Sequence, residues 1–127
     1  MAQRARAITI PTEHEEQCAF VAWFRLQFPK VAILAIPNGA HLAGSLRVRQ
    51  AKMARMKAEG LLPGVPDLFI PAWRLWIEMK RQKASVVSPE QRDMIDYLSA
   101  NGYRVAVARG FDEARRAVED YRIKAAT

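Results

Sequence analysis

The strongest constraint on the fold is a short segment in which apolar and charged residues alternate, Trp76-Ile77-Glu78-Met79-Lys80. Successive side chains of a β-strand point to opposite faces. Glu78 and Lys80 therefore share one face of a predicted strand, and the apolar residues Leu75, Ile77 and Met79 share the other. We expect the apolar face to pack against the core and the charged face to line a site with chemical function.

A second acidic residue precedes this strand. Asp67 closes the segment Gly64-Val65-Pro66-Asp67, and residues 67–70 are predicted to form another strand that turns back through residues 71–73. Such a hairpin would bring Asp67 close to Glu78 and Lys80. Mg2+ prefers oxygen ligands and usually takes only one or two carboxylates from a protein. We interpret Asp67 and Glu78 as metal ligands, and Lys80 as a group that orients water or offsets developing negative charge. The alternative is an ordinary hairpin with an exposed Glu and Lys.

Further segments, in a consistent order, favour a functional site over an ordinary hairpin. They are Glu13-His14-Glu15-Glu16-Gln17, Pro37-Asn38-Gly39, residues 60–64 and Ser88-Pro89-Glu90-Gln91. Together with Pro66-Asp67 and Glu78-Met79-Lys80, they resemble the virus-type replication-repair nuclease domain, VRR-NUC, of the PD-(D/E)xK nuclease superfamily. The resemblance spans most of the chain. It implies an endonuclease that acts on DNA with Mg2+ or Mn2+, and small stand-alone members of the family are associated with branched DNA such as four-way (Holliday) junctions.

The resemblance also implies roles for three polar residues outside the hairpin. Glu13 would supply an additional carboxylate near the metal, Gln91 would help to position water or phosphate, and Asn38 would lie near a DNA phosphate. Each residue also has a local explanation, since acidic first turns, capping boxes and Asn-Gly turns are common. Glu16 adjoins the same apolar stripe of the first helix as Glu13, so the choice between these two glutamates stays open.

The chain carries a net charge of +7 and has a pI near 10.1, which suits a polyanionic partner such as DNA. Residues 45–59 are predicted to form the most basic helix. We expect side chains of this helix and of the segment after the Glu78 strand to contact phosphates: Arg47, Arg49, Lys52, Arg55, Arg81 and Lys83. The alternative for the helix is a solvated charged face.

The remaining segments predict an α/β fold. Thr12 should begin a helix that runs to about residue 27, and the apolar residues 31–36 should form a buried strand. A helix from Ser88 to about residue 101, a strand over 103–108 and a helix over 111–121 should follow. The strand-helix-strand unit predicts two parallel strands. The predicted architecture is a restriction-endonuclease-like core, with a central mixed β-sheet flanked by helices.

A chain of 127 residues indicates one domain. The resemblance identifies it as a nuclease domain over residues 12–127, and residues 1–11 are expected to form a flexible N-terminal arm. The single cysteine, Cys18, is expected in the core. No apolar stretch predicts a signal peptide or membrane span, so we expect a cytoplasmic protein of a bacterium or of a phage-infected host. The small size suggests that a homodimer grips the DNA.

These features predict a metal-dependent, structure-selective endodeoxyribonuclease, with Holliday-junction resolution as its most specific form. Two alternatives stay open. One is a flap or restriction-type nuclease, and the other is a non-catalytic DNA-binding module that keeps the basic surface.

Overall fold

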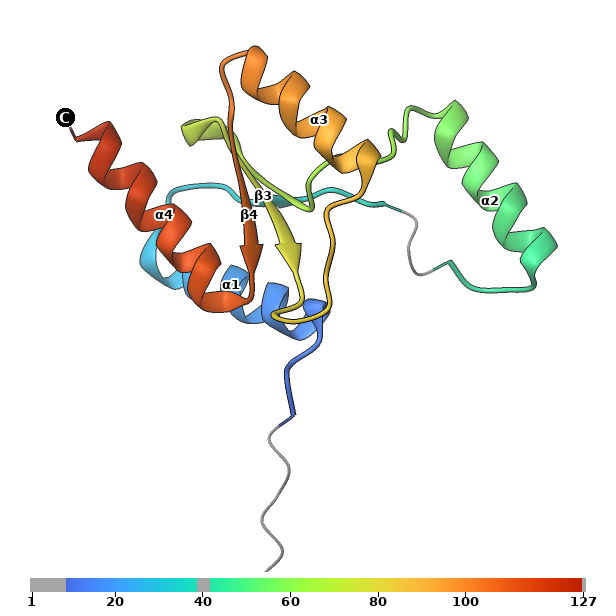
Figure 1. Ribbon diagram of the computed structural model, residues 1–127, viewed down its shortest axis with the longest axis horizontal. Coiled ribbons are helices and arrows are strands. Elements are labelled where there is room, and N and C mark those ends of the chain that lie inside the picture. The colour runs from blue at the N-terminus through green and yellow to red at the C-terminus, as the bar shows by residue number, and fades with distance from the viewer. Residues whose placement is uncertain (1–8, 39–41, 127) are drawn as a thin grey trace, which may run out of the picture.

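The computed structural model describes residues 9–38 and 42–126, so the predicted arm up to residue 8, and Gly39, lie outside the described residues. The described residues form, in order, α1 (Glu13–Gln27), β1 (Leu34–Ala35), α2 (Leu46–Ala58), β2 (Leu68–Ile70), the 3-10 turn η1 (Pro71–Trp73), β3 (Leu75–Lys80), α3 (Pro89–Ala100), β4 (Arg104–Arg109) and α4 (Phe111–Ala125) (Figure 1). This is the predicted order of helices and strands. Within the described ranges, no helix combines the length and apolar character needed to cross a bilayer.

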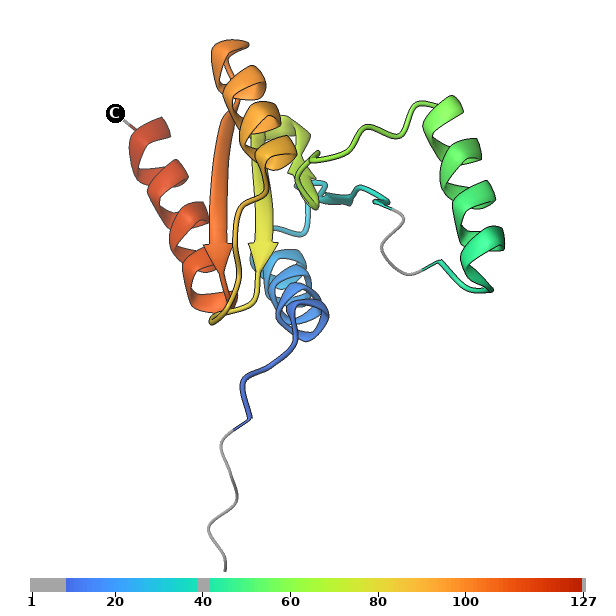
Figure 2. The ribbon, with the colours of Figure 1, turned by 45° about the vertical axis from the view of Figure 1, so that its right-hand side comes forward.

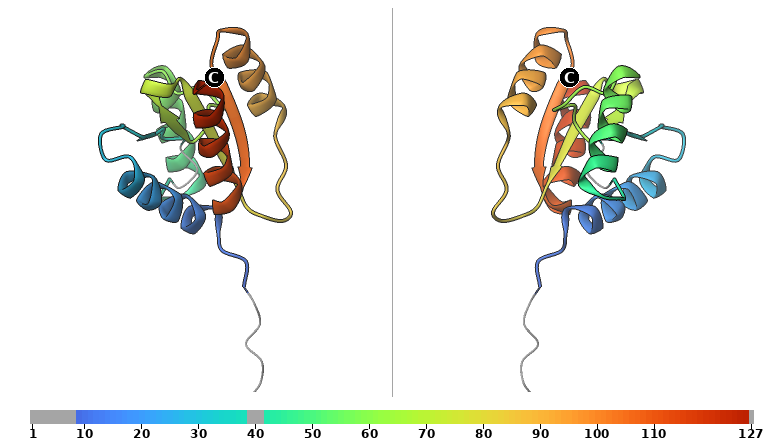
Figure 3. Two further views of the ribbon diagram at one scale, coloured as in Figure 1. Left: turned by 90° about the vertical axis from the view of Figure 1, so that its left-hand side faces the viewer. Right: turned by 90° about the vertical axis from the view of Figure 1, so that its right-hand side faces the viewer.

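The four strands form one mixed sheet in the order β1-β2-β3-β4. Strands β1, β2 and β3 pair antiparallel, whereas β3 and β4 pair parallel across the α3 crossover. In both views of Figure 3, β4 runs between α4 and α3. The predicted α/β fold, with a restriction-endonuclease-like sheet between helices, is confirmed.

The core lies on the face of the sheet that α1 and α4 cover. The apolar residues of β3, Leu75, Ile77 and Met79, are 3%, 0% and 0% exposed, which confirms the predicted alternation. They belong to one cluster with Phe20 of α1 and Val118 of α4. Each such fully buried side chain stabilises the fold by about 1.5–3 kcal/mol relative to exposure. Because this packing fixes one face of β3 inward, Glu78 and Lys80 must point to the face that carries α3.

Two helices begin as the sequence predicts. Thr12 and Glu15 form a reciprocal capping box at the start of α1. Ser88 and Gln91 form another at the start of α3, with proline in the first helical turn. Such caps satisfy backbone N–H groups that have no partner inside a helix, which fixes where each helix starts.

Three predictions differ from the structure. The strand predicted over residues 31–36 is reduced to β1, whose two residues are exposed, because its partner β2 offers few backbone groups for pairing. Cys18 is exposed and lies 3.5 Å from the His14 ring nitrogen, so it is not a core residue. Helix α4 continues four residues beyond the predicted end at Tyr121, through an exposed last turn.

Helix α2 stands apart from the sheet, as Figures 1 and 2 both show. None of its 13 residues is buried, and Met53 and Met56 are half-buried. Ser45 caps its first turn, and Gly60 follows its end with a positive φ of 114°. The basic side chains of α2 are therefore displayed on a projecting element.

Candidate active site

Two carboxylates face each other across the β2–β3 hairpin. The register pairs Leu68 with Ile77, and continuing it by one residue places Asp67 opposite Glu78. Both acids are buried, with 7% and 3% of their surface exposed. Directly opposite residues of an antiparallel pair have neighbouring side chains. The fold thus brings together the two acids that the sequence indicates as metal ligands.

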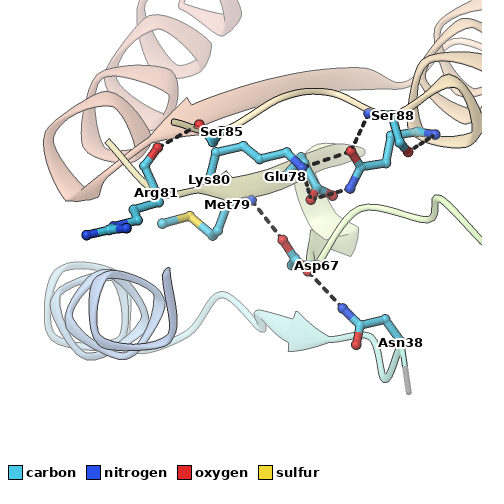
Figure 4. A network of polar contacts seen from close by, with 9 residues as sticks. Asn38, Asp67, Glu78, Met79, Lys80, Arg81, Ser85 and Ser88 are labelled. Carbon is cyan, nitrogen blue, oxygen red and sulfur yellow. Dashed lines mark hydrogen bonds and ion pairs between the residues drawn. The ribbon is translucent and has the colours of Figure 1, made fainter. Parts of the chain in front are cut away.

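Backbone and side-chain donors fix the Asp67 carboxylate. The Met79 N–H donates to Asp67 Oδ2 at 2.9 Å, and the Asn38 amide nitrogen lies 3.5 Å from Asp67 Oδ1 (Figure 4). Sequence reasoning could not find the Met79 contact, because any residue except proline would supply the same N–H. Asn38, expected near a DNA phosphate, lies beside a candidate metal ligand.

Gln91 connects the other members of the site. Its Nε2 donates to Glu78 Oε1 at 3.0 Å, and its Oε1 accepts from Lys80 Nζ at 2.8 Å. The same Oε1 accepts from the Ser88 N–H at 2.9 Å, so the residue that caps α3 also holds two site residues. Lys80 Nζ lies 3.7 Å from Glu78 Oε1 as an ion pair. The capping and active-site explanations of Gln91 are therefore compatible.

The two acids lie in an environment that disfavours their ionisation. Burial, followed by the charge of Asp67, raises the pKa of Glu78 to about 8. Burial likewise raises the pKa of Asp67, although the Met79 N–H and the Lys80 charge oppose that rise. The single positive charge of Lys80 does not offset the burial and mutual repulsion of two ionised carboxylates. A divalent cation would supply the additional positive charge. The oxygen donors and their unmet negative charge fit Mg2+ or Mn2+.

The two candidate glutamates of α1 occupy different surroundings. Glu13 lines a cavity of about 430 Å³ together with Asp67 and Asn38, and its negative charge contributes to the raised pKa of Glu78. Glu16 is 5% exposed and accepts hydrogen bonds from Gln82 Nε2 at 2.9 Å and from the Phe111 N–H. Glu16 therefore ties α1 to the start of α4, whereas Glu13 faces the carboxylate site.

Among the described residues, the carboxylate pair has no third acidic residue close enough to form a three-ligand group. In the described part of the chain, no group of three or more His, Cys, Asp and Glu side chains is placed to hold a metal. Glu13 accordingly lies at the margin of the site. Mg2+ commonly binds through one or two carboxylates and completes its shell with water and substrate phosphate, so two acids suffice.

Gly64 allows the loop before Asp67 to touch α3. Its φ is 87°, and a Cβ atom built on it would overlap the Glu90 carbonyl and lie 2.8 Å from the Gln91 nitrogen. Only glycine combines this backbone conformation with so close an approach. The contact places Asp67 and the first turn of α3 in a fixed relation.

The cations predicted to bind DNA lie outside this cluster. The cations of α2 are exposed on the projecting helix: Arg47, Arg49, Lys52 and Arg55. Lys52 also donates to the Ala43 carbonyl at 3.0 Å. Arg81 and Lys83 are exposed in the segment after β3, and the Arg81 side chain extends away from Glu78 in Figure 4. The structure thus groups the acids with Lys80 and Gln91, and leaves these cations outside the group.

Comparisons with known proteins agree with this arrangement. The sequence model of the VRR-NUC domain matches residues 1–112. A solved structure described as a VRR_NUC domain protein is similar to this chain with a TM-score of 0.71 and 27% sequence identity, over 89% of each chain. No curated protein matches the sequence.

Proposed function

Because this chain belongs to the VRR-NUC domain family, we propose that it is a metal-dependent, structure-selective endodeoxyribonuclease that resolves Holliday junctions. Membership implies nuclease activity and DNA as the substrate, and nucleases of the PD-(D/E)xK type typically use a divalent metal. The observation that carries the proposal is the Gln91 side chain, which bonds both Glu78 and Lys80 beside Asp67. A merely structural hairpin has no need to bury two acids and a lysine together.

Asp67 and Glu78 would hold Mg2+ or Mn2+, with Glu13 assisting from the margin of the same cavity. When bound, the ion polarises the scissile phosphodiester and lowers the pKa of the attacking water. The raised pKa values of both acids support this assignment, because a cation would favour their ionised forms.

Lys80 and Gln91 act on the substrate side of the pair. The Lys80 ammonium lies between Glu78 and Gln91, from where it can orient water or offset the charge that develops on the phosphate oxygens. Gln91 holds that ammonium and the Glu78 carboxylate in one geometry, so it is a positioning residue. Asn38, whose amide nitrogen lies 3.5 Å from Asp67 Oδ1, would lie near a DNA phosphate beside that carboxylate.

The cations predicted to bind DNA would track the phosphates flanking the cleavage point. The projection of α2 and the net charge of +7 support this role. Replacing Arg47, an exposed α2 residue, by alanine should lower the slope of log affinity against log salt by about 1. The same change at Arg116, exposed on α4, is the matched control and should leave the salt slope unchanged.

A homodimer would supply two such centres for the paired cuts of a four-way junction. Exposed apolar residues on α2 support an association surface, since Leu46 is 63% exposed and Val48 is 45% exposed. Sedimentation should give twice the monomer mass for the wild type. Leu46→Ser should shift the protein toward the monomer.

The proposal is tested by cleavage of a labelled four-way junction beside linear duplex, flap and single-stranded DNA, in Mg2+, Mn2+ or EDTA. We expect symmetric, metal-dependent nicks on the junction, reduced by at least about 100-fold in Glu78→Gln. Glu119→Gln, on the exposed surface of α4, should cleave like the wild type.

Two other results would replace the assignment as a junction-selective nuclease. Cutting of every substrate would keep the nuclease and remove junction selectivity, as a flap or restriction-type enzyme would. A folded wild type that binds DNA without cutting it in either metal would identify a non-catalytic DNA-binding module.

A further inference from the structure

A second cavity adjoins the carboxylate site. It has a volume of about 390 Å³, within the range of about 300–1,000 Å³ typical of small-ligand sites. Its walls are mainly apolar and include Ile36, Met56, Leu61, Leu62, Val65 and Trp76. Ile36 and Pro37 also line the cavity that contains Asp67 and Asn38. Ile36 and Pro37 therefore form a wall shared by the apolar cavity and the cavity that contains Asp67.

The cavity also borders the most basic helix. Met56 and Glu59 line it from the end of α2, and Arg55 and Lys57 lie in the last turn of that helix. These cations attract a phosphate backbone, whereas the apolar walls favour a flat, poorly hydrated group attached to it. A nucleotide combines both properties, because its phosphate and its base are joined through one sugar.

The details of the walls suit a nucleobase. Trp76 stacks on Phe69 with ring centroids 4.1 Å apart and an interplanar angle of 18°, which makes its ring a rigid part of the wall. Leu62 is 60% exposed, so an apolar side chain is available to cover an occupant. Glu59 offers a carboxylate that can accept from the exocyclic amino group of adenine, cytosine or guanine.

We propose that this cavity takes one unpaired nucleobase of the DNA, next to the phosphodiester at the metal site formed by Asp67 and Glu78. The inference rests on the proposed nuclease function for its substrate and specifies how that substrate is selected. Extrusion of a base costs least where the base is already unpaired or poorly stacked, as at a branch point. Capture of the base thus favours branched DNA over uninterrupted duplex without any reading of sequence.

The test places 2-aminopurine, a fluorescent base that carries an amino group, at the branch point of a four-way junction or inside a matched duplex. Fluorescence and anisotropy are recorded in EDTA, so that binding is measured without cleavage. Binding of the wild type should change the fluorescence of the branch-point base and leave that of the duplex base unchanged. Leu62→Ser should bind the junction about fivefold more weakly, because apolar contact with the base is lost.

A matched variant separates the cavity from a general effect of replacing leucine. Leu26 is 81% exposed on α1 and does not line the cavity, so Leu26→Ser should bind like the wild type. Leu62→Met, which keeps an apolar side chain, should restore junction affinity. Circular dichroism confirms that each variant is folded before its affinity is interpreted.

Three results would overturn the inference. They are a branch-point fluorescence that ignores the protein, equal junction affinities for Leu62→Ser and Leu26→Ser, and a change of sedimenting mass in Leu62→Ser that accounts for its weaker binding. The last would assign the cavity to a second copy of the chain. Cleavage of the same junction in Mg2+ is scored separately, so loss of the base signal with cleavage intact overturns the base site alone. A base signal sensitive to Leu62→Ser, with no cleavage, supports the base site and removes the nuclease.

Discussion

Raising the pH in the absence of divalent ions is expected to destabilise the folded protein through Glu78. Burial and the neighbouring Asp67 raise the pKa of Glu78 from 4.5 to about 8 in the folded state. Between these two values the unfolded chain has already lost the proton that the folded protein still holds. The stability associated with this proton is therefore complete below pH 4.5 and is lost as the pH rises to about 8. Asp67, whose pKa is also raised by burial, adds to the effect in the same direction.

The size of the effect follows from the two pKa values. A difference of one in pKa corresponds to about 1.4 kcal/mol, so the gap between 4.5 and about 8 sets a ceiling of about 5 kcal/mol. Water and nearby dipoles rearrange around the ionised carboxylate, and buried sites behave with an effective dielectric constant of about 20. We therefore expect a loss of about 2–3 kcal/mol in the free energy of unfolding.

Urea unfolding of the wild type and Glu78→Gln, at pH 5 and pH 8.5 in EDTA, measures this loss. The wild type should lose about 2–3 kcal/mol more than the variant between the two pH values. Adding Mg2+ at pH 8.5 should restore the stability of the wild type and leave Glu78→Gln unchanged. Glu119→Gln, at an exposed carboxylate, is the control and should follow the wild type. Equal pH dependence in the wild type and Glu78→Gln would show that the buried Glu78 carboxyl does not cause the loss of stability at high pH.

Five further substitutions test the supports of the site. Gln91→Ala should lower the free energy of unfolding by about 1–2 kcal/mol, because the α3 cap is lost, and it should slow cleavage about 100-fold. A loss of cleavage that the loss of folded protein fully explains would contradict the positioning role of Gln91. Gly64→Ala should lower the free energy of unfolding by roughly 2–3 kcal/mol, because the added Cβ meets the backbone of α3. Gly60→Ala is the control for the positive φ alone: its φ is 114° and nothing lies within 4 Å of the added Cβ, so thermal unfolding should show a loss of about 1 kcal/mol. Glu16→Ala should destabilise the protein by about 2–3 kcal/mol. Glu13→Ala should slow cleavage and change the stability by no more than about 0.5 kcal/mol. Slow cleavage in Glu16→Ala with a loss of stability in Glu13→Ala would instead assign the site role to Glu16 and the structural role to Glu13.

Local sequence signals predict the parts of the fold that local chemistry determines. The alternation around Glu78 fixed the faces of β3, and the Ser88–Gln91 capping box marked the start of α3. The length of β1 had no such signal. An apolar run is compatible with a buried strand, but the number of residues that pair depends on the partner strand, and β2 has three residues.

The sequence predicts the proximity of those candidate site residues that belong to one hairpin. Asp67 and Glu78 belong to neighbouring strands, so their proximity follows from the hairpin and its register. Glu13 and Glu16 differ in their surroundings because Glu16 accepts from the Phe111 N–H, which lies far along the chain and cannot be inferred from the spacing of α1. The apolar cavity was equally hidden, because its walls come from several segments that meet only in the folded protein.

The most direct test of the metal centre is anomalous diffraction from crystals of the protein soaked in Mn2+. An anomalous peak in contact with both the Asp67 and Glu78 carboxylates is the predicted result, and the peak should be absent in crystals of Glu78→Gln. Mn2+ bound only at other carboxylates, or no peak in crystals of a protein that still cleaves DNA in Mn2+, would contradict the assignment of these two residues as the metal ligands.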